Sequence, residues 1–217
     1  MSAKLDVVGE SALQFFGKMS ASISHEINNV LAIINENAGL LEDVTLMEER
    51  GVPLDPEKLK KISRKILEQV KRANGITQNM NRFAHSVDET IKRVDIADTM
   101  GFMIVLSSRL SDMKRVSFTM DSGSDRFEIT TNPFLLQNVI WLCLDYLMNR
   151  AKSGDTIPIS LEDRDSDVLI RFSGINGLDD MTTCDFPAER ETRLLETLNG
   201  KLEIDNGAGE IVLCLKH

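Results

Sequence analysis

The sequence predicts an α+β protein in which a long antiparallel helical hairpin is followed by an α/β sandwich. Two patterns in the chain of 217 residues support this prediction. Apolar residues recur at every third or fourth position as far as about residue 86, which is the spacing of amphipathic helices. After about residue 92, short alternating strands are mixed with helices, and hairpin turns join several of the strands. We therefore expect a helical domain over residues 1–90 and a sandwich domain over residues 91–217.

The first helix is expected to run from near Leu5 to near Arg50. Its apolar face is formed by residues spaced by three or four, namely Phe16, Met19, Ile23, Ile27, Val30, Ile34, Ala38 and Leu41. At about 100° per residue, His25 falls on the opposite face of this helix. The stripe around it carries small or polar side chains, which are Lys18, Ser22, Asn29, Ala32 and Glu36. A partner could therefore approach the imidazole of His25 closely.

The second helix is expected from Asp55 to about Ser86. Gly51 ends the first helix, while Asp55 and Pro56 are suited to the N-cap and the first turn of the next. Its apolar seam is Leu59, Ile62, Ile66, Val70, Ala73, Ile76, Met80 and Phe83. A hairpin with one apolar stripe per helix has no closed core of its own. Two chains should therefore pair as a homodimer with a four-helix bundle.

Folding this hairpin about residue 52 predicts which part of the second helix faces His25. The imidazole would lie level with residues 78–82. Arg82 or Arg72 could then lie near a group bound to His25. The alternative is that both arginines are solvated charges on the bundle surface.

The second half of the chain mixes helices and strands. The expected helices are 94–110, 134–150 and 188–198, and the expected strands are 116–120, 127–130, 156–162, 168–172, 201–205 and 210–215. Asn132 and Pro133 begin the middle helix. Asn206 and Gly207 form a tight turn in the last hairpin. Helices on one face of a sheet are expected from this order.

Composition excludes several classes of function. A net charge of −9 repels phosphate backbones, so no nucleic-acid partner is expected. No apolar run approaches the roughly 18 residues that cross a bilayer, so no membrane partner is expected. The three cysteines (Cys143, Cys184 and Cys214) show no metal-binding spacing and are expected to be reduced, buried thiols. With no signal-like N-terminus, the expected location is cytoplasmic.

The segment from Ser24 to Asn29, Ser-His-Glu-Ile-Asn-Asn, resembles the phosphoacceptor box of dimeric histidine kinases. In that family the histidine carries a phosphoryl group, and the acidic residue after it assists proton movement. An Asn or Thr follows four residues after the histidine. His25, Glu26 and Asn29 fill these three places. Neutral imidazole is a good nucleophile near pH 7, and a neighbouring carboxylate can take its proton. The alternative is a solvated histidine on a bundle helix.

The rest of the chain resembles the ATP-binding domain of the same family. Three stretches carry this resemblance: Arg93–Ile96, Asn132–Val139 and Asn199–Ile204. In that family ATP·Mg²⁺ is bound by two helix asparagines, an Asp-x-Gly-x-Gly loop and a glycine-rich lid.

The residues needed for that nucleotide site are replaced in this chain. Leu142 and Tyr146 stand in place of the two asparagines, and Ser173 stands in place of the loop aspartate. No glycine occurs between Leu178 and Ala188, where the lid should be. Asp205–Gly209 has the letters of the adenine loop, but its place between two apolar strands favours a hairpin turn. We expect no nucleotide, no cofactor and no metal of its own.

The resemblance implies a histidine phosphotransferase of a two-component phosphorelay, with a vestigial ATPase-like domain. It would shuttle phosphoryl groups between receiver-domain aspartates through His25 without autophosphorylation from ATP. The receiver would contact Ser22, Ala32 and Glu36 and bring its own Mg²⁺. Because 24 residues precede His25, any input is expected from another protein. The alternatives are a response-regulator phosphatase in which Asn29 or Glu26 orients water, a non-catalytic adaptor, and, last, a kinase with a divergent nucleotide site.

Overall fold

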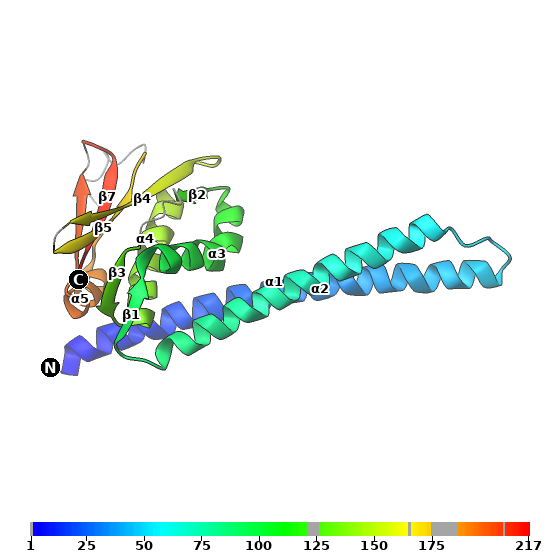
Figure 1. Ribbon diagram of the computed structural model, residues 1–217, viewed down its shortest axis with the longest axis horizontal. Coiled ribbons are helices and arrows are strands. Elements are labelled where there is room, and N and C mark those ends of the chain that lie inside the picture. Colours follow the sequence, from blue (N-terminus) through cyan, green and yellow to red (C-terminus); the bar gives the residue numbers. More distant parts are fainter. Residues whose placement is uncertain (1, 121–125, 165, 175–185, 206) are drawn as a thin grey trace. The chain divides into compact units, whose positions relative to one another are not determined.

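The computed structural model describes residues 2–120, 126–164, 166–174, 186–205 and 207–217. The chain folds into two compact units. One, the hairpin unit, is Ser20–Ala84, and the other, the sandwich unit, joins the residues up to Met19 to His85–His217. Figure 1 shows both units in one ribbon.

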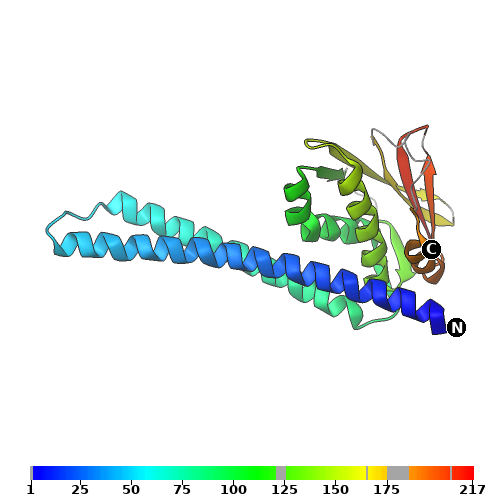
Figure 2. The same cartoon turned by 180° about the vertical axis from the view of Figure 1, so that it is seen from behind.

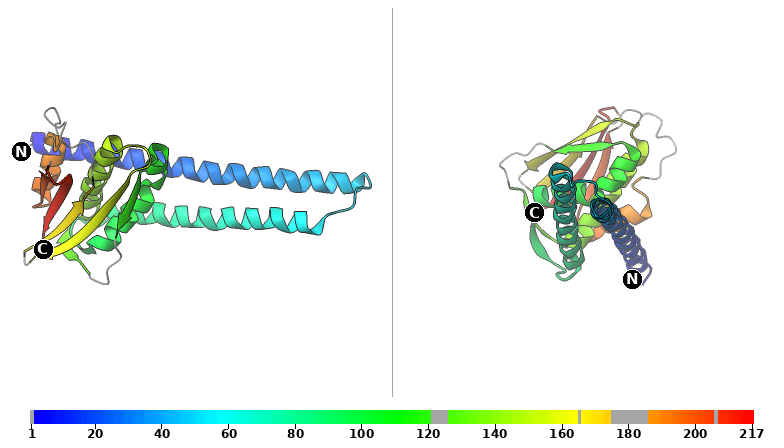
Figure 3. Two further views of the ribbon diagram at one scale, coloured as in Figure 1. Left: turned by 90° about the horizontal axis from the view of Figure 1, so that it is seen from above. Right: turned by 90° about the vertical axis from the view of Figure 1, so that its right-hand side faces the viewer.

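The hairpin unit contains two helices that lie side by side and run in opposite directions (Figures 1 and 3). Helix α1 is Ser2–Glu49 and helix α2 is Pro56–Ala84, so both predicted helices are confirmed. Gly51 has a φ of 87°, a left-handed conformation that suits glycine after a helix end. The Asp55 carboxylate accepts a hydrogen bond from the backbone N–H of Glu57 at 2.9 Å, as an N-cap does. In the described part of the chain, no helix is both long and apolar enough to cross a membrane.

A seven-residue repeat forms the buried side of α1 in this unit. The buried residues of the repeat are Ile23, Val30, Asn37 and Val44. On α2, Ile62 and Ile76 are buried and Gln69 is half-buried between them, again at intervals of seven. Two residues of the predicted seam are exposed in the single chain, Val70 at 41% and Met80 at 42%. The single chain therefore half-buries Gln69 and leaves Val70 open to the second chain that the predicted bundle requires.

The sandwich unit is built on a five-stranded sheet with the order β2-β4-β5-β7-β6. Its strands are β2 (Ser117–Met120), β4 (Thr156–Arg164), β5 (Asp167–Phe172), β7 (Glu210–Lys216) and β6 (Lys201–Asp205). β2 and β4 are parallel, and every other neighbouring pair is antiparallel. A separate antiparallel pair consists of β1 (Lys92–Asp95) and β3 (Glu128–Thr131). The strand predictions are therefore confirmed in order, with β1 as an addition.

Three helices lie on one side of the large sheet (Figures 1 and 2). They are α3 (Ile96–Lys114), α4 (Pro133–Arg150) and α5 (Glu189–Thr197), and a short 3₁₀ helix, η1 (His85–Val87), precedes β1. Helix α4 supplies the centre of the core, because four of its leucine and isoleucine side chains are completely buried: Leu136, Ile140, Leu144 and Leu147. Helix packing on a mainly antiparallel sheet gives the α+β class that the sequence predicts.

Helix α3 begins later than predicted. The expected start at Val94 is wrong, because Val94 pairs with Ile129 in the small sheet. Asp95 ends the strand and caps the helix, since its carboxylate accepts a hydrogen bond from the backbone N–H of Ala97 at 2.8 Å. The capping aspartate was the available signal for a start at Ile96.

The last two strands form a hairpin, as predicted. Asp205 pairs with Glu210, so the residues between them connect two adjacent strands. The Asp205 carboxylate accepts a hydrogen bond from the backbone N–H of Ala208 at 2.9 Å. The Asp-x-Gly-x-Gly letters of this stretch therefore belong to a turn. Asn206 lies outside the described residues.

The N-terminal turns of α1 belong to the sandwich unit, whereas the expected division at residue 90 assigned them to the helical domain. The Phe15 and Phe134 rings are 5.4 Å apart. The Lys18 ammonium is 2.9 Å from the Asp145 carboxylate and 4.8 Å from the centre of the Trp141 ring. These contacts join the first turns of α1 to α4. The amphipathic pattern of α1 carried no sign of this second role.

Phe15→Ala should destabilise the sandwich unit by about 3–5 kcal/mol, because it removes a buried ring from the contact with α4. Urea denaturation followed by the fluorescence of Trp141, the single tryptophan, measures this. Leu13→Ala is the matched control, since Leu13 is 75% exposed on the same helix and its loss should cost less than about 0.5 kcal/mol. Equal losses in the two variants would show that these turns do not stabilise the sandwich.

The C-terminal His217 should titrate above its ordinary pKa of 6.5, because a hydrogen bond to Asp163 at 2.9 Å raises the pKa of its imidazole. Since the folded value is the higher one, this bond contributes to stability below about pH 6.5 and is lost as the pH rises through the folded value. An NMR titration of the ring protons measures the pKa. Asp163→Asn should lower it, and an unchanged value would exclude the bond.

Candidate functional site

The three residues of the predicted phosphoacceptor box lie within about one turn of α1. His25 and Asn29 are exposed, and the Glu26 side chain is 22% exposed. Residues four apart on a helix are neighbours on its surface, so the imidazole of His25 and the amide of Asn29 share one face. A docked partner could contact both side chains at once.

The exposed stripe continues along α1 past the box. Ala32 and Glu36 are exposed, in agreement with the helical geometry of the prediction. The predicted exposure of Ser22 is wrong, because only 4% of this residue is accessible. Ser22 lies three positions after the fully buried Met19 and is therefore within about 60° of it around the helix. The stripe accordingly begins at His25, with Asn29, Ala32 and Glu36 as the residues open to a partner.

Helix α2 places a cation beside Glu26. The Arg72 guanidinium (Nη2) lies 3.7 Å from a carboxylate oxygen (Oε1) of Glu26, and both residues belong to the hairpin unit. Residues 78–82 were expected opposite His25, and this prediction is wrong by several residues, because Arg72 lies there instead. Helix α1 continues to Glu49, and the connection to Pro56 runs back along it (Figure 3). The midpoint about which the two helices pair therefore lies before residue 52. Arg72 is beside the box as a result.

The imidazole of His25 is available for chemistry. It is exposed, and among the described residues it has no hydrogen-bond partner or ion-pair partner. Neutral imidazole offers one unprotonated ring nitrogen as a nucleophile, and its other nitrogen carries the proton. The arrangement of an exposed imidazole, an adjacent carboxylate and a nearby guanidinium is suited to receiving an anionic phosphoryl group.

The positions that would correspond to the nucleotide site lie on α4 and after β5. Leu142 is buried and offers no oxygen to a magnesium ion. The Tyr146 ring is stacked on Phe186 at 4.1 Å, and the Arg150 guanidinium lies 5.6 Å from the centre of the same ring. Ser173 follows β5 in place of the expected aspartate, and its backbone N–H donates to Pro158 O at 3.1 Å. These residues do not fit ATP·Mg²⁺. The predicted loss of the lid falls mostly outside the described residues.

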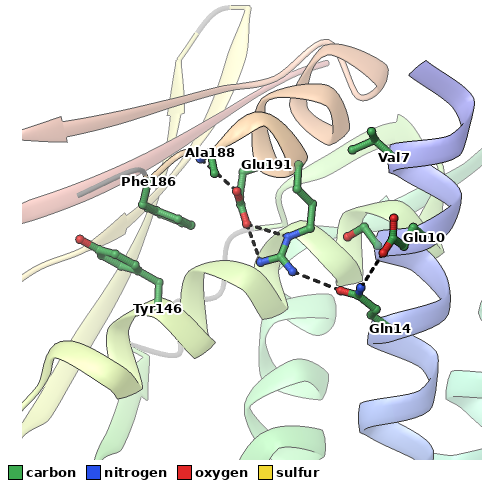
Figure 4. Close-up of a pocket in the computed structure, with 9 residues that line it drawn as sticks. Val7, Glu10, Gln14, Tyr146, Phe186, Ala188 and Glu191 are labelled. Atoms are coloured by element: carbon green, nitrogen blue, oxygen red, sulfur yellow. Dashed lines mark hydrogen bonds and ion pairs between the residues drawn. The ribbon is translucent and has the colours of Figure 1, made fainter. Parts of the chain in front are cut away.

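A cavity of about 490 Å³ lies between the first turns of α1, the end of α4 and the start of α5. Figure 4 shows a chain of polar contacts along it. The Arg190 guanidinium donates to Glu191 at 2.8 Å and to Gln14 at 3.5 Å, and the Gln14 amide donates to Glu10 at 3.1 Å. The second Glu191 oxygen accepts the backbone N–H of Ala188 at 3.0 Å. These groups satisfy one another and connect α1 to α5, so we interpret the cavity as part of the scaffold.

The described cysteines do not offer a second nucleophile. Burial raises the pKa of the Cys143 thiol to about 12, so it stays protonated at neutral pH. Burial also raises the pKa of the half-buried Cys214 thiol. Both are free thiols, as predicted, although only Cys143 is fully buried. Cys184 lies outside the described residues.

No protein-family model matches the sequence, and no curated protein matches it either. The chain is similar in structure to several histidine kinases. Histidine kinase AdeS of Acinetobacter baumannii is 13% identical, with a TM-score of 0.47, over 88% of this chain and 97% of that one. The catalytic domain of histidine kinase ThkA, nucleotide-free, is 10% identical with a TM-score of 0.46, over 59% of this chain and 97% of that one. ThkA in complex with response regulator protein TrrA is 17% identical with a TM-score of 0.46, over 94% of this chain and 61% of that one.

Proposed function

We propose that this protein is a dimeric histidine phosphotransferase of a two-component phosphorelay. His25 would carry a phosphoryl group between the aspartates of response-regulator receiver domains. The observation that carries the proposal is the exposed imidazole of His25, with the Glu26 carboxylate and the Asn29 amide within one turn. The box Ser24–Asn29 resembles that of dimeric histidine kinases and supports the same assignment.

The proposed transfer needs no group that the chain and a receiver do not supply. An unprotonated ring nitrogen of His25 attacks the phosphorus of the receiver's aspartyl phosphate. A nitrogen–phosphorus bond forms, the oxygen–phosphorus bond breaks, and its electron pair leaves with the receiver's carboxylate. The proton of the other ring nitrogen passes to Glu26 or to water. The reverse step phosphorylates a second receiver, whose own Mg²⁺ balances the charge.

The same proposal holds that the phosphoryl group does not come from ATP. The buried Leu142 and the stacked ring of Tyr146 support this, because Leu142 has no oxygen and Tyr146 has no amide oxygen of the kind that the family's asparagines supply to a metal–nucleotide complex. The protein then acts without a cofactor of its own.

A receiver domain would contact the stripe formed by His25, Asn29, Ala32 and Glu36. The methyl side chain of Ala32 allows a partner backbone or side chain to come close to α1. Positioning of the two reacting residues supplies most of the rate in phosphoryl transfer, so this close approach matters. A receiver partner and reduced cysteines are both suited to the cytoplasm, where we place the protein.

Exposed apolar residues on both helices of the hairpin unit support the homodimer. Between 39% and 57% of each is accessible in the single chain, and they are Leu31, Leu40, Leu46, Met47, Leu67, Val70 and Met80. These side chains are available for contact with a second chain. A second hairpin packed on it would complete a four-helix bundle.

Sedimentation should show a dimer at micromolar concentration. Val70→Glu should raise the dimer dissociation constant by at least about a hundredfold, because an unpaired carboxylate would be buried in the interface. The hairpin should remain helical by circular dichroism, since Val70 is exposed in the single chain. Lys71→Glu, an exposed neighbour, is the control. A wild-type monomer at this concentration would exclude the bundle.

A response-regulator phosphatase is the second candidate. The exposed Asn29 amide, one turn from His25, favours it because an amide can orient a water molecule toward a receiver's phosphate. In that case His25 would be incidental to the reaction. A non-catalytic adaptor would use the same helix face without either residue acting chemically.

Incubation with phosphorylated receivers should place acid-labile phosphate on the wild-type protein, whereas ATP·Mg²⁺ should not. His25→Ala should abolish this label, and Asn29→Ala should retain it while slowing hydrolysis of receiver phosphate. Both residues are exposed, so unfolding free energies should change by less than about 0.5 kcal/mol. Asn35→Ala, at an exposed asparagine beyond the box, is the control and should behave as wild type.

Each alternative gives a different pattern in the same assay. A phosphatase would remain active in His25→Ala and fail in Asn29→Ala. An adaptor would respond to neither change. Phosphate on the His25→Ala protein would exclude His25 as the carrier.

A further inference from the structure

Arg72 and Glu26 form an ion pair across the hairpin, next to the exposed imidazole. The distance from Arg72 Nη2 to Glu26 Oε1 is 3.7 Å. Charge-assisted hydrogen bonds are about 2.7–2.9 Å long, so the guanidinium is attracted to the carboxylate without being locked to it. The Arg72 side chain is 53% exposed, whereas that of Glu26 is 22% exposed. The cation therefore remains open to a ligand that arrives from solvent.

From this geometry we propose that Arg72 positions Glu26 before phosphoryl transfer and then contacts the phosphoryl group on His25. This inference rests on the proposed function and names a residue that the phosphoacceptor box does not contain. His25 and Glu26 are consecutive on α1 and differ in height by only about 1.5 Å along the helix axis, so the exposed guanidinium held at Glu26 lies at the level of the imidazole.

The charges explain why a cation is needed at this point. Glu26 is an anion directly beside the nucleophile, and an incoming phosphoryl group is also an anion. The guanidinium of Arg72 offsets the repulsion between them. After transfer, the phosphoryl oxygens offer the planar fork of arginine a bidentate partner, which a single carboxylate at 3.7 Å does not provide.

The exchange of partners has a chemical consequence for Glu26. When Arg72 turns to the phosphoryl oxygens, the carboxylate is released from its ion pair. It can then accept the proton that the phosphorylated imidazole carries on its other ring nitrogen. Arg72 acts on this proton transfer through Glu26, so it is a positioning residue before transfer and a phosphoryl contact after it.

The test uses the full-length protein and two phosphoryl donors. Phosphoramidate phosphorylates exposed histidines directly, and a phosphorylated receiver supplies the proposed partner. Arg72→Ala should slow labelling of His25 by about tenfold with both donors, because one screened positive charge near the reacting phosphate is lost. Arg72→Lys should recover part of the rate, since it keeps the charge and loses the fork. Lys71→Ala removes the same charge from the exposed neighbouring residue and should remain within about twofold of wild type.

Two further measurements separate this role from a structural one. The difference between Arg72→Ala and wild type should shrink in about 1 M salt, because exposed charges are screened there. The double variant Glu26→Arg with Arg72→Glu restores an ion pair and should restore thermal stability, but it should not restore the labelling rate. A full recovery of the rate by this exchange would reduce Arg72 to a structural partner and overturn the proposal.

The remaining outcomes distinguish the two hypotheses. If Arg72→Ala labels as fast as Lys71→Ala with either donor, the role of Arg72 is excluded while His25 remains the carrier. If no receiver labels any variant but phosphoramidate gives the expected order of rates, the phosphorelay is excluded and Arg72 keeps its role. If neither phosphoramidate nor a phosphorylated receiver labels His25 in the wild type, both are excluded.

Discussion

The seven-residue repeat on α1 determines which side chains of the hairpin face solvent. Ile23, Val30 and Val44 must be buried for the two helices to pack, and this fixes the rotation of α1 about its own axis. His25 is two positions after Ile23, so the same rotation directs its imidazole outward. Glu26 falls at the border between the two faces, where it is half-buried and can reach Arg72. The exposure of His25 therefore depends on apolar contacts at the opposite face of α1.

Much of the fold follows from local patterns in the sequence. The helices of the hairpin, the order of the strands and the exposure of His25 and Asn29 depend on periodicity and on capping residues, which a single sequence displays. Ser22 was misplaced because a small polar residue on the flank of a seam can be buried without leaving a cavity. The polarity of a serine therefore does not predict whether it is buried or exposed at such a position.

Other features depend on how distant segments meet. The pairing of Arg72 with Glu26 depends on the path of the connection between α1 and α2, which the helical repeat does not specify. The contact of Phe15 with Phe134 joins residues far apart in the chain. The burial of Leu142 and the stacking of Tyr146 also depend on distant segments, because the sequence shows which residues occupy these positions but not how they pack. The sequence lacks the asparagines expected of a nucleotide site at these two positions, and the fold shows a buried side chain and a stacked ring there.

Asn37 has a consequence for the alignment of the hairpin. It is buried in the repeat of α1, its amide donates to Ile33 O at 2.7 Å, and its side-chain oxygen has no partner among the described residues. An amide at such a position weakens a seam that leucine would strengthen, and in coiled coils it selects one register over others. A slip of α2 by one heptad along α1 would carry Arg72 away from Glu26 by about 10 Å. A polar residue that lowers stability would in this way keep His25 and Glu26 of one helix at the same level as the guanidinium of the other.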